Sequence, residues 1–327
     1  MRSIIEVANL TKVYKIHKRK LGIMNAIKDF FSRKYEFVTA LQNITFNINE
    51  GEIVGYIGPN GAGKTTTLKI LSGILYPTDG IVKIMGRIPQ RREKAFLRRI
   101  TFIMGQRGQL WWDIPAIDTF LLIKETYGIS TSDFRNTLEE LVEMFKIGEL
   151  IYVPVRKLSL GERMKMEIIA GLLHNPKILF LDEPSIGLDF VSQDSIRNFL
   201  IEYNRKFKAT ILLTSHYMKD IESICDRIII LHKGKIIFDG NKAEIMNRVP
   251  KDKVVRITFK HYPLPKHGDL EYLLSGNGKE YKFKVPQNAI PKLIDRLSAY
   301  GDIDEVRVEE MDFEDAIKLI FKNEEIS

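Results

Sequence analysis

One short stretch, "GPNGAGKTT", has the residue types and the spacing of a phosphate-binding loop. It matches the pattern G-x-x-x-x-G-K-[ST] at Gly58, Gly63, Lys64 and Thr65. The glycines let backbone amides curl around a phosphate, the lysine supplies a positive charge, and the threonine hydroxyl can be a ligand of Mg²⁺. An apolar run precedes the loop and a helical pattern follows it, which is the context that this motif requires. The sequence therefore predicts that a nucleotide binds here.

Two acidic residues end a second apolar run, "KILFLDEP". In open parallel sheets, ligands bind beyond the carboxyl ends of the strands, so Asp182 can hold Mg²⁺ directly or through water. Glu183 is the next residue and projects differently, so it could orient or deprotonate an attacking water. A third run, "ATILLTSH", ends at His216. On the residues alone, that histidine is either a site residue or an ordinary polar residue at a strand end.

The stretch "LSLGERMKM" has the pattern of a helix start. Ser159 is a good N-cap, and Glu162 three residues later completes a capping box, which satisfies two amide donors. A helix start is also an anion site, because its free amides and dipole favour negative charge. Local structure alone could explain this stretch, but its place between two phosphate motifs indicates a further role.

These motifs must be positioned by a parallel sheet. From Gly51 to about Gly240, short apolar strands alternate with amphipathic helices, as in a sheet covered by helices on both faces. After about residue 248 the pattern changes, and "KVVRITFK" and "EYKFKVP" alternate apolar with polar residues. We therefore expect an α/β domain over 1–247 and a small α+β domain over 248–327.

Composition limits the classes of protein further. The chain has 327 residues, 44% apolar residues and a net charge of +8, which is an ordinary globular balance that permits an anionic partner without requiring one. Its one cysteine, Cys225, excludes an internal disulfide framework, indicates a reducing compartment and is expected to be buried. With no apolar run long enough for a membrane span and no signal-peptide pattern, we expect a cytoplasmic chain.

The segment 16–37, "IHKRKLGIMNAIKDFFSRKYEF", fits neither domain. It opens with basic residues, and its apolar residues then recur at helical spacing, so the pattern predicts a short basic amphipathic helix. Such a helix could lie against its own domain or contact anionic lipid headgroups.

The order "GPNGAGKTT", "LSLGER", "KILFLDEP", "SIGLD", "TSH" resembles the ATP-binding subunit of ATP-binding cassette (ABC) transporters, from Ile4 to about Gly240. The resemblance implies a P-loop NTPase cassette: a mostly parallel sheet, an antiparallel β subdomain and a helical subdomain, with ATP and Mg²⁺ as ligands. It also implies that the helix start at Ser159 caps the γ-phosphate bound to a second protomer. Two residues depart from the family pattern, since Leu160 and Glu162 replace its commoner glycine and glutamine, and Arg163 can offset the added negative charge.

The resemblance assigns roles residue by residue. Glu183 would be the catalytic carboxylate, His216 would contact the γ-phosphate, and Gln106 in "IMGQRGQLWW" would sense Mg²⁺ and the attacking water, with Gln109 as its rival. Asp189 in "SIGLD" would join two protomers. The nucleotide-binding residues expected are Tyr14 (stacked on adenine), Gly58, Asn60, Gly61, Gly63, Lys64, Thr65, Thr66, Ser159, Gly161, Glu162, Asp182 and Asp189, with Thr65, Gln106 and Asp182 as metal ligands.

Two further stretches resemble exporter subunits. "GQLWWDIP" is similar to a subgroup that serves separate permeases for drugs, lipids or polysaccharides, and "MDFEDAIKLIF" is similar to the last helix of its small accessory domain. The resemblance implies a pair of cassettes, in the simplest case identical, on the inner face of the cell membrane. Adjacent tryptophans usually pack in a core, so we expect Trp111 and Trp112 to be buried, with exposure towards a permease as the alternative.

Other ATPase classes fit less well. A soluble cassette ATPase of ribosomes carries two cassettes in one chain, and a DNA-repair ATPase has a long heptad arm that splits the cassette; neither feature is present. The basic and aromatic residues are not interleaved as in a nucleic-acid groove, so no nucleic-acid partner is expected. A nucleotide kinase or small GTPase would share the phosphate loop but would not need "LSLGER".

Overall fold

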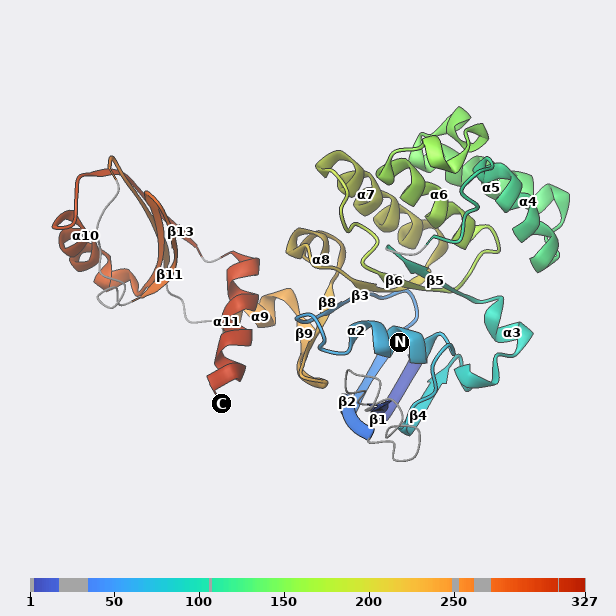
Figure 1. The fold of residues 1–327 in the computed structure, drawn as a ribbon, viewed down its shortest axis with the longest axis horizontal. Coiled ribbons are helices and arrows are strands. Elements are labelled where there is room, and N and C mark those ends of the chain that lie inside the picture. Colours follow the sequence, from blue (N-terminus) through green and yellow to red (C-terminus); the bar gives the residue numbers. More distant parts are fainter. Residues whose placement is uncertain are drawn as a thin grey trace, which may run out of the picture. The chain divides into compact units, whose positions relative to one another are not determined.

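The computed structural model of the chain describes residues 3–17, 35–105, 108–248, 253–261, 272–310 and 312–326 (Figure 1). The chain divides into two compact units, Met1–Asn241 and Lys242–Ser327. The division comes earlier than the boundary expected after residue 247, because helix α9 (Lys242–Arg248) packs against helix α11 (Phe313–Ile326) of the second unit.

A six-stranded sheet forms the centre of the first unit, in the order β5-β6-β7-β3-β8-β9. The first five strands in this order are parallel, and only β9 runs antiparallel to its neighbour β8. Every residue of β3, β6 and β7 is buried, which explains their nearly continuous apolar sequences. The strands are β3 (Ile53–Ile57), β5 (Ile100–Met104), β6 (Ile178–Asp182), β7 (Thr210–Thr214), β8 (Arg227–His232) and β9 (Lys235–Asn241).

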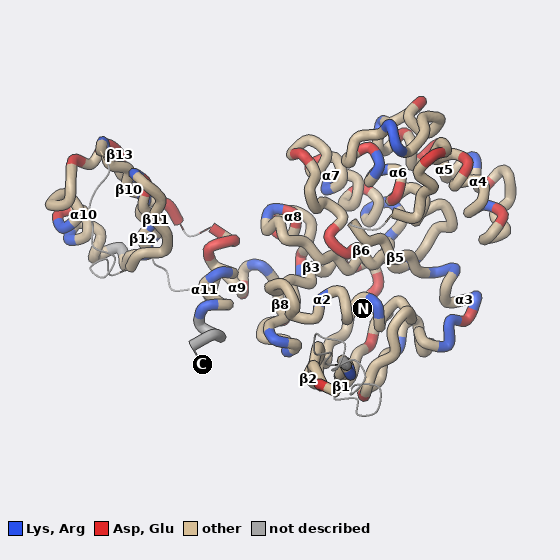
Figure 2. Tube along the Cα trace, in the orientation of Figure 1, with Lys and Arg blue, Asp and Glu red and all other residues tan. Residues whose placement is uncertain are grey.

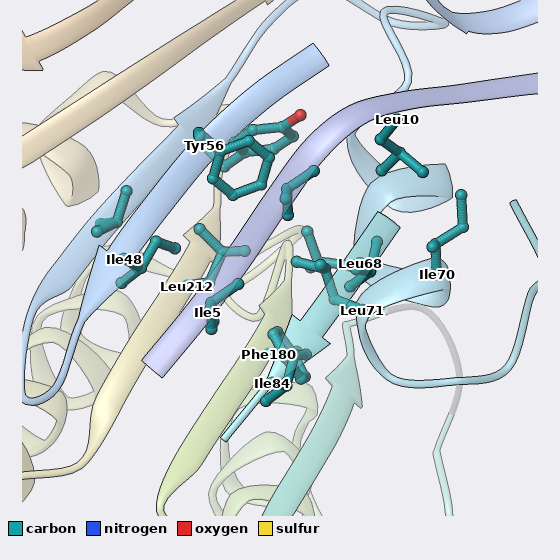
Figure 3. Packing of buried hydrophobic residues seen from close by; sticks show 14 of the residues in the cluster. Ile5, Leu10, Ile48, Tyr56, Leu68, Ile70, Leu71, Ile84, Phe180 and Leu212 are labelled. Atoms are coloured by element: carbon teal, nitrogen blue, oxygen red, sulfur yellow. The ribbon is translucent and has the colours of Figure 1, made fainter. Parts of the chain in front are cut away.

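A second, antiparallel sheet packs on one side of the first, in the order β2-β1-β4. It contains β1 (Ser3–His17), β2 (Tyr35–Asn49) and β4 (Asp79–Ile84). Figure 3 shows side chains from both sheets and from helix α2 (Lys64–Leu71) meeting in one apolar core, among them Ile5, Tyr56, Leu68 and Phe180, each fully buried. This core fixes α2, and with it the phosphate loop, between the two sheets.

The segment 16–37 is strand at both ends, so these ends belong to the antiparallel sheet, although the whole segment was expected to lie outside both domains. Ile16 and His17 end β1, and they pair with Glu36 and Tyr35 at the start of β2. The expected amphipathic helix itself falls on 18–34, which lies outside the described residues.

Helices cover the other side of the parallel sheet (Figure 1). They are α4 (Ala116–Tyr127), α5 (Thr131–Phe145), α6 (Leu160–Leu172), α7 (Phe190–Phe207) and α8 (Met218–Ile224). Cys225 follows α8 and is 5% exposed, and its Sγ would lie 3.2 Å from a Cβ at Gly55. This burial raises the pKa of its thiol. The expected antiparallel β and helical subdomains are therefore both present around the parallel sheet.

The second unit is an α+β domain, as its alternating pattern predicted. Four antiparallel strands have the order β11-β12-β10-β13, and helix α10 (Ile290–Ser298) packs on one face of them. The strands are β10 (Lys253–Phe259), β11 (Leu273–Asn277), β12 (Glu280–Val285) and β13 (Ile303–Glu310). Across both units, the described residues contain no helix with the length and hydropathy of a membrane span.

Candidate nucleotide site

The loop between β3 and α2 has a shape that requires glycine at several positions. Gly61 and Gly63 have positive φ angles of 78° and 110°. A Cβ at Gly58 would lie 2.2 Å from the carbonyl oxygen of Leu231, and one at Gly63 would lie 2.7 Å from that of Ala40. Gly63 provides no side-chain cap for α2, so the first amides of the helix remain available to an anion. Asn60 is exposed on the same loop.

Lys64 folds back over this loop. Its Nζ donates hydrogen bonds to the carbonyl oxygens of Gly58 at 2.7 Å and Pro59 at 3.2 Å, and the residue is only 5% exposed. Burial lowers the pKa of Lys64, while the nearby carboxylates of Glu183 and Asp182 oppose that shift. A phosphate in the loop would favour the charged ammonium further.

Asp182 lies at the carboxyl end of β6, where its carboxylate accepts hydrogen bonds from two hydroxyl groups. Thr65 Oγ1 donates to Oδ2 and Thr214 Oγ1 donates to Oδ1, both at 2.8 Å. The described residues contain no group of three or more His, Cys, Asp or Glu that could hold a metal alone. One carboxylate beside one hydroxyl nevertheless fits Mg²⁺, which is usually bound by one or two protein oxygens together with substrate phosphates and water. Gln106, the third expected metal ligand, lies outside the described residues.

Glu183 has an unusual backbone and a different set of partners from Asp182. Its φ is 55°, in the left-handed region that non-glycine residues rarely adopt. Non-glycine residues with this conformation are often found at functional sites. Its amide donates to Thr214 Oγ1 at 3.0 Å, and its Oε1 lies 2.6 Å from Nε2 of His216. Figure 2 shows the acidic residues gathered where β6 ends. The structure thus places Lys64, Thr65, Asp182, Glu183 and His216 around one loop.

A second group of expected residues lies at the start of α6. Ser159 caps the helix, and its amide donates to Glu162 Oε2 at 2.8 Å, so the expected capping box is present. Ser159 is exposed. A Cβ at Gly161 would lie 2.1 Å from Ser192 Oγ, which in turn donates to Asp189 Oδ2 at 2.7 Å. The helix start and the Asp189 cap of α7 are therefore direct neighbours.

Tyr14 lies on β1 next to the start of α2. Its hydroxyl is 3.3 Å from Thr66 Oγ1, and Lys12 Nζ lies 5.2 Å from the centre of its ring. The half-buried ring is close to the phosphate loop, and its stacking on adenine stays a prediction.

Comparisons with known proteins agree with this geometry. The family model described as "ABC transporter" matches residues 41–186. The chain is 30% identical over 234 residues to the ABC transporter ATP-binding protein NatA of Bacillus subtilis, an alignment that covers 69% of this chain and 95% of that protein. This chain belongs to the ATP-binding proteins of ABC transporters.

Another relative and two solved structures are also similar to this ABC protein. It is 27% identical to the bacitracin transport ATP-binding protein BcrA of Bacillus licheniformis, over 94% of this chain and 90% of that one. A solved ATP-binding subunit of an ABC transporter matches with a TM-score of 0.61 and 25% identity over 75% of this chain and 92% of its own. A dimeric ABC cassette with bound ADP and Pi matches with a TM-score of 0.60 and 26% identity, over 72% and 98%. The family and the cassette fold expected from the motifs are confirmed, as is the ATPase activity.

Sequence reasoning missed several residues that hold the cassette's site together. Thr214 Oγ1 links the Asp182 carboxylate to the backbone of Glu183, since it donates to Asp182 Oδ1 and accepts from the Glu183 amide. Asp220, 2% exposed, accepts hydrogen bonds from Arg197 Nη1 at 2.7 Å and Ser215 Oγ at 2.9 Å, and also from Ser185 Oγ. The motifs "TSH" and "DEPS" contain the Thr and both Ser residues, so their position in those motifs was the available signal.

The tryptophan pair of the cassette is exposed, so the expectation of core burial was wrong. Trp111 is 59% and Trp112 55% exposed, and the guanidinium of Arg163 lies 5.5 Å from the Trp112 ring. On α4, Leu121 and Leu122 are exposed as well. Exposed apolar side chains of this size favour a contact surface over a core position.

Proposed function

We propose that this chain is the ATPase subunit of an exporter: two identical chains drive a separate membrane permease from the inner face of the cell membrane. The observation that carries this proposal is the division of the expected site into two groups. One group surrounds the phosphate loop, and the other is the exposed helix start at Ser159 on the opposite side of the sheet from α2 (Figure 1). A second chain, placed head to tail, would bring its helix start to the first chain's phosphate.

Hydrolysis in this proposal uses the residues around the loop. Lys64 and the amides of the loop bind the β- and γ-phosphates, and Tyr14 supports the adenine. Glu183 takes a proton from water while the water oxygen attacks the γ-phosphorus and the bond to the bridging oxygen of ADP breaks. The 2.6 Å contact with His216 holds the Glu183 carboxylate in place and puts the imidazole near the γ-phosphate. Thr65, Asp182 and Gln106 would hold Mg²⁺, which when bound neutralises charge on the phosphate oxygens.

The partner's phosphate is bound by the Ser159 group. Ser159 and the amide of Gly161 face the γ-phosphate across the interface, and Asp189 contacts the partner chain. The Glu162 carboxylate accepts from Ser159 Oγ at 2.8 Å, so its charge is directed back into the capping box. Arg163, one residue further on, balances that charge. ATP binding would close the pair of chains and hydrolysis would reopen it.

The exposed tryptophan pair and the exposed leucines of α4 support docking to a permease. The relative named for bacitracin transport supports an exporter, so we assign drugs, lipids or polysaccharides as the cargo class. Segment 16–37 is proposed to contact anionic lipid headgroups. Figure 2 shows basic residues interspersed with acidic ones, which supports the absence of a nucleic-acid partner.

Purification of the tagged chain from its own cells in mild detergent tests this proposal, with identification of co-purifying proteins by mass. The proposal expects a multi-span membrane protein in stoichiometric amount. Ribosomal proteins or DNA-repair factors in place of any membrane protein would contradict it.

A further inference from the structure

A buried carboxylate on α6 binds the loop that carries both tryptophans. Glu167 is 4% exposed, and its Oε2 accepts from the amide of Gln109 at 2.9 Å while its Oε1 accepts from the amide of Leu110 at 3.3 Å. The Gln109 side chain donates in return to the carbonyl oxygen of Glu167 at 3.2 Å. Gln109, the rival candidate for the water-sensing glutamine, is thus engaged with α6.

The loop has a shape that suits this carboxylate. A Cβ at Gly108 would lie 2.3 Å from Glu167 Oε1, so a larger residue there would displace the carboxylate from its present position. Burial raises the pKa of Glu167, and the two loop amides oppose that shift. A buried charge is costly in a core position, and an apolar side chain would pack there at lower free energy. The carboxylate is therefore better explained by what it holds than by packing.

The same loop is fixed to the helical part at further points. The Trp111 amide donates to Thr119 Oγ1 of α4 at 3.4 Å, and the Arg156 amide donates to the Trp112 carbonyl oxygen at 2.9 Å. By contrast, the Gly105 amide donates to the carbonyl oxygen of Asp182 at 2.9 Å, so the chain before the loop is attached to the parallel sheet.

Ser159, Arg163 and Glu167 follow one another at spacings of four residues along α6, so they lie on one face of the helix. We propose that Glu167 is a positioning residue: it fixes the Gly108–Trp112 loop to α6, so that the tryptophan pair moves together with the helix start at Ser159. The inference rests on the proposed function, in which Ser159 binds the partner's nucleotide and the tryptophans face the permease. Closure on ATP would then be passed to the permease surface through one rigid helix.

Amide hydrogen exchange tests the contact in the chain without nucleotide. Glu167→Gln keeps the shape but has only one acceptor oxygen for two amides. The proposal expects exchange at Gln109 and Leu110 to become about tenfold faster or more, because a charged acceptor is lost. Gly108→Ala disturbs the contact from the loop side and should have the same effect even if the first variant is poorly folded. Glu139→Gln, exposed on α5, is the control. Unchanged exchange at both amides in both variants would overturn the proposal.

Tryptophan emission tests the coupling, because Trp111 and Trp112 are the only two tryptophans of the chain. In a Glu183→Gln background that retains ATP, we expect ATP to change the emission, and Glu167→Gln to remove that change while ATP-dependent pairing persists. An identical change with and without Glu167 would overturn the coupling. Failure of the background chain itself to pair would instead contradict the proposed function, and the exchange experiment would still test Glu167.

Discussion

At the scale of single residues, Glu183 combines a left-handed backbone with direct contact between its carboxylate and a histidine. Its left-handed backbone is held by Thr214, and the carbonyl oxygen of Glu183 would lie 2.0 Å from a Cβ at Gly105. A carboxylate that lies beside a histidine and is held by a strained backbone is expected of a proton acceptor rather than of a packing residue.

Glu183→Gln should therefore lower ATP turnover by about 10²- to 10⁴-fold, the usual contribution of a general base. ATP affinity should remain, since Lys64 and the loop are untouched. Phosphate release and equilibrium ATP binding measure the two quantities, with Glu139→Gln as the control of equal charge change. Undiminished turnover in the Glu183 variant would remove this residue from the reaction.

The Thr214 hydroxyl links the Asp182 carboxylate to the backbone amide of Glu183, and it has no other described hydrogen-bond partner. Thr214→Val keeps the shape but leaves Asp182 Oδ1 without its donor, so unfolding free energy should fall by about 1–3 kcal/mol. If the loss of this hydrogen bond raises the activation free energy of hydrolysis by a similar amount, turnover should drop about tenfold or more. Thr214→Ser should restore most of both, and equal turnover in the valine and serine variants would contradict this role.

The phosphate loop could be predicted residue by residue because its requirements are local: positive φ angles and close backbone approach select glycine. The burial of the tryptophan pair was predicted wrongly because exposure depends on which surface the folded chain presents. Nothing in the local sequence could pair Arg197 with Asp220, since α7 and α8 meet only in the folded structure.

At the scale of elements, the start of α6 was predicted correctly. Ser159 caps it with a hydrogen bond that spans three residues, so the local sequence contains the information needed. Asp189 caps α7 in the same way, but this cap was not predicted. The whole segment 16–37 was placed outside both domains, whereas pairing between β1 and β2 makes its two ends part of a strand. Such long-range pairing depends on the folded chain and is not visible in the local sequence.

Arg197 and Asp220 connect α7, α8 and the loops after β6 and β7 in one buried network. Arg197→Ala leaves the Asp220 carboxylate buried without its cation, which should lower the free energy of unfolding by about 3–5 kcal/mol. Denaturant unfolding measures this loss. Arg205→Ala, near the end of the same helix, is the matched control, and equal stability of the two variants would show that the network is not structural.

At the scale of the whole molecule, one chain contains two groups of site residues and uses them in different places. In the proposed function, the loop group would bind the phosphates and Mg²⁺ and accept a proton, whereas the Ser159 group, an exposed and capped helix start, would bind the partner's phosphate. The sequence order of the motifs was sufficient to identify the family and the fold. No single helix or strand identifies the chain that binds across the interface, so the pairing of two chains has to be measured directly.

Light scattering on the Glu183→Gln chain, with and without ATP and Mg²⁺, tests that claim most directly. If ATP joins two chains head to tail, the molar mass doubles with ATP and returns to that of one chain without it. Adding Ser159→Arg to the same chain should leave ATP binding intact and abolish the doubling, because the longer side chain blocks the helix start. A chain that binds ATP yet stays monomeric with Ser159 intact, or whose molar mass doubles despite the arginine, would contradict head-to-tail pairing through the helix start.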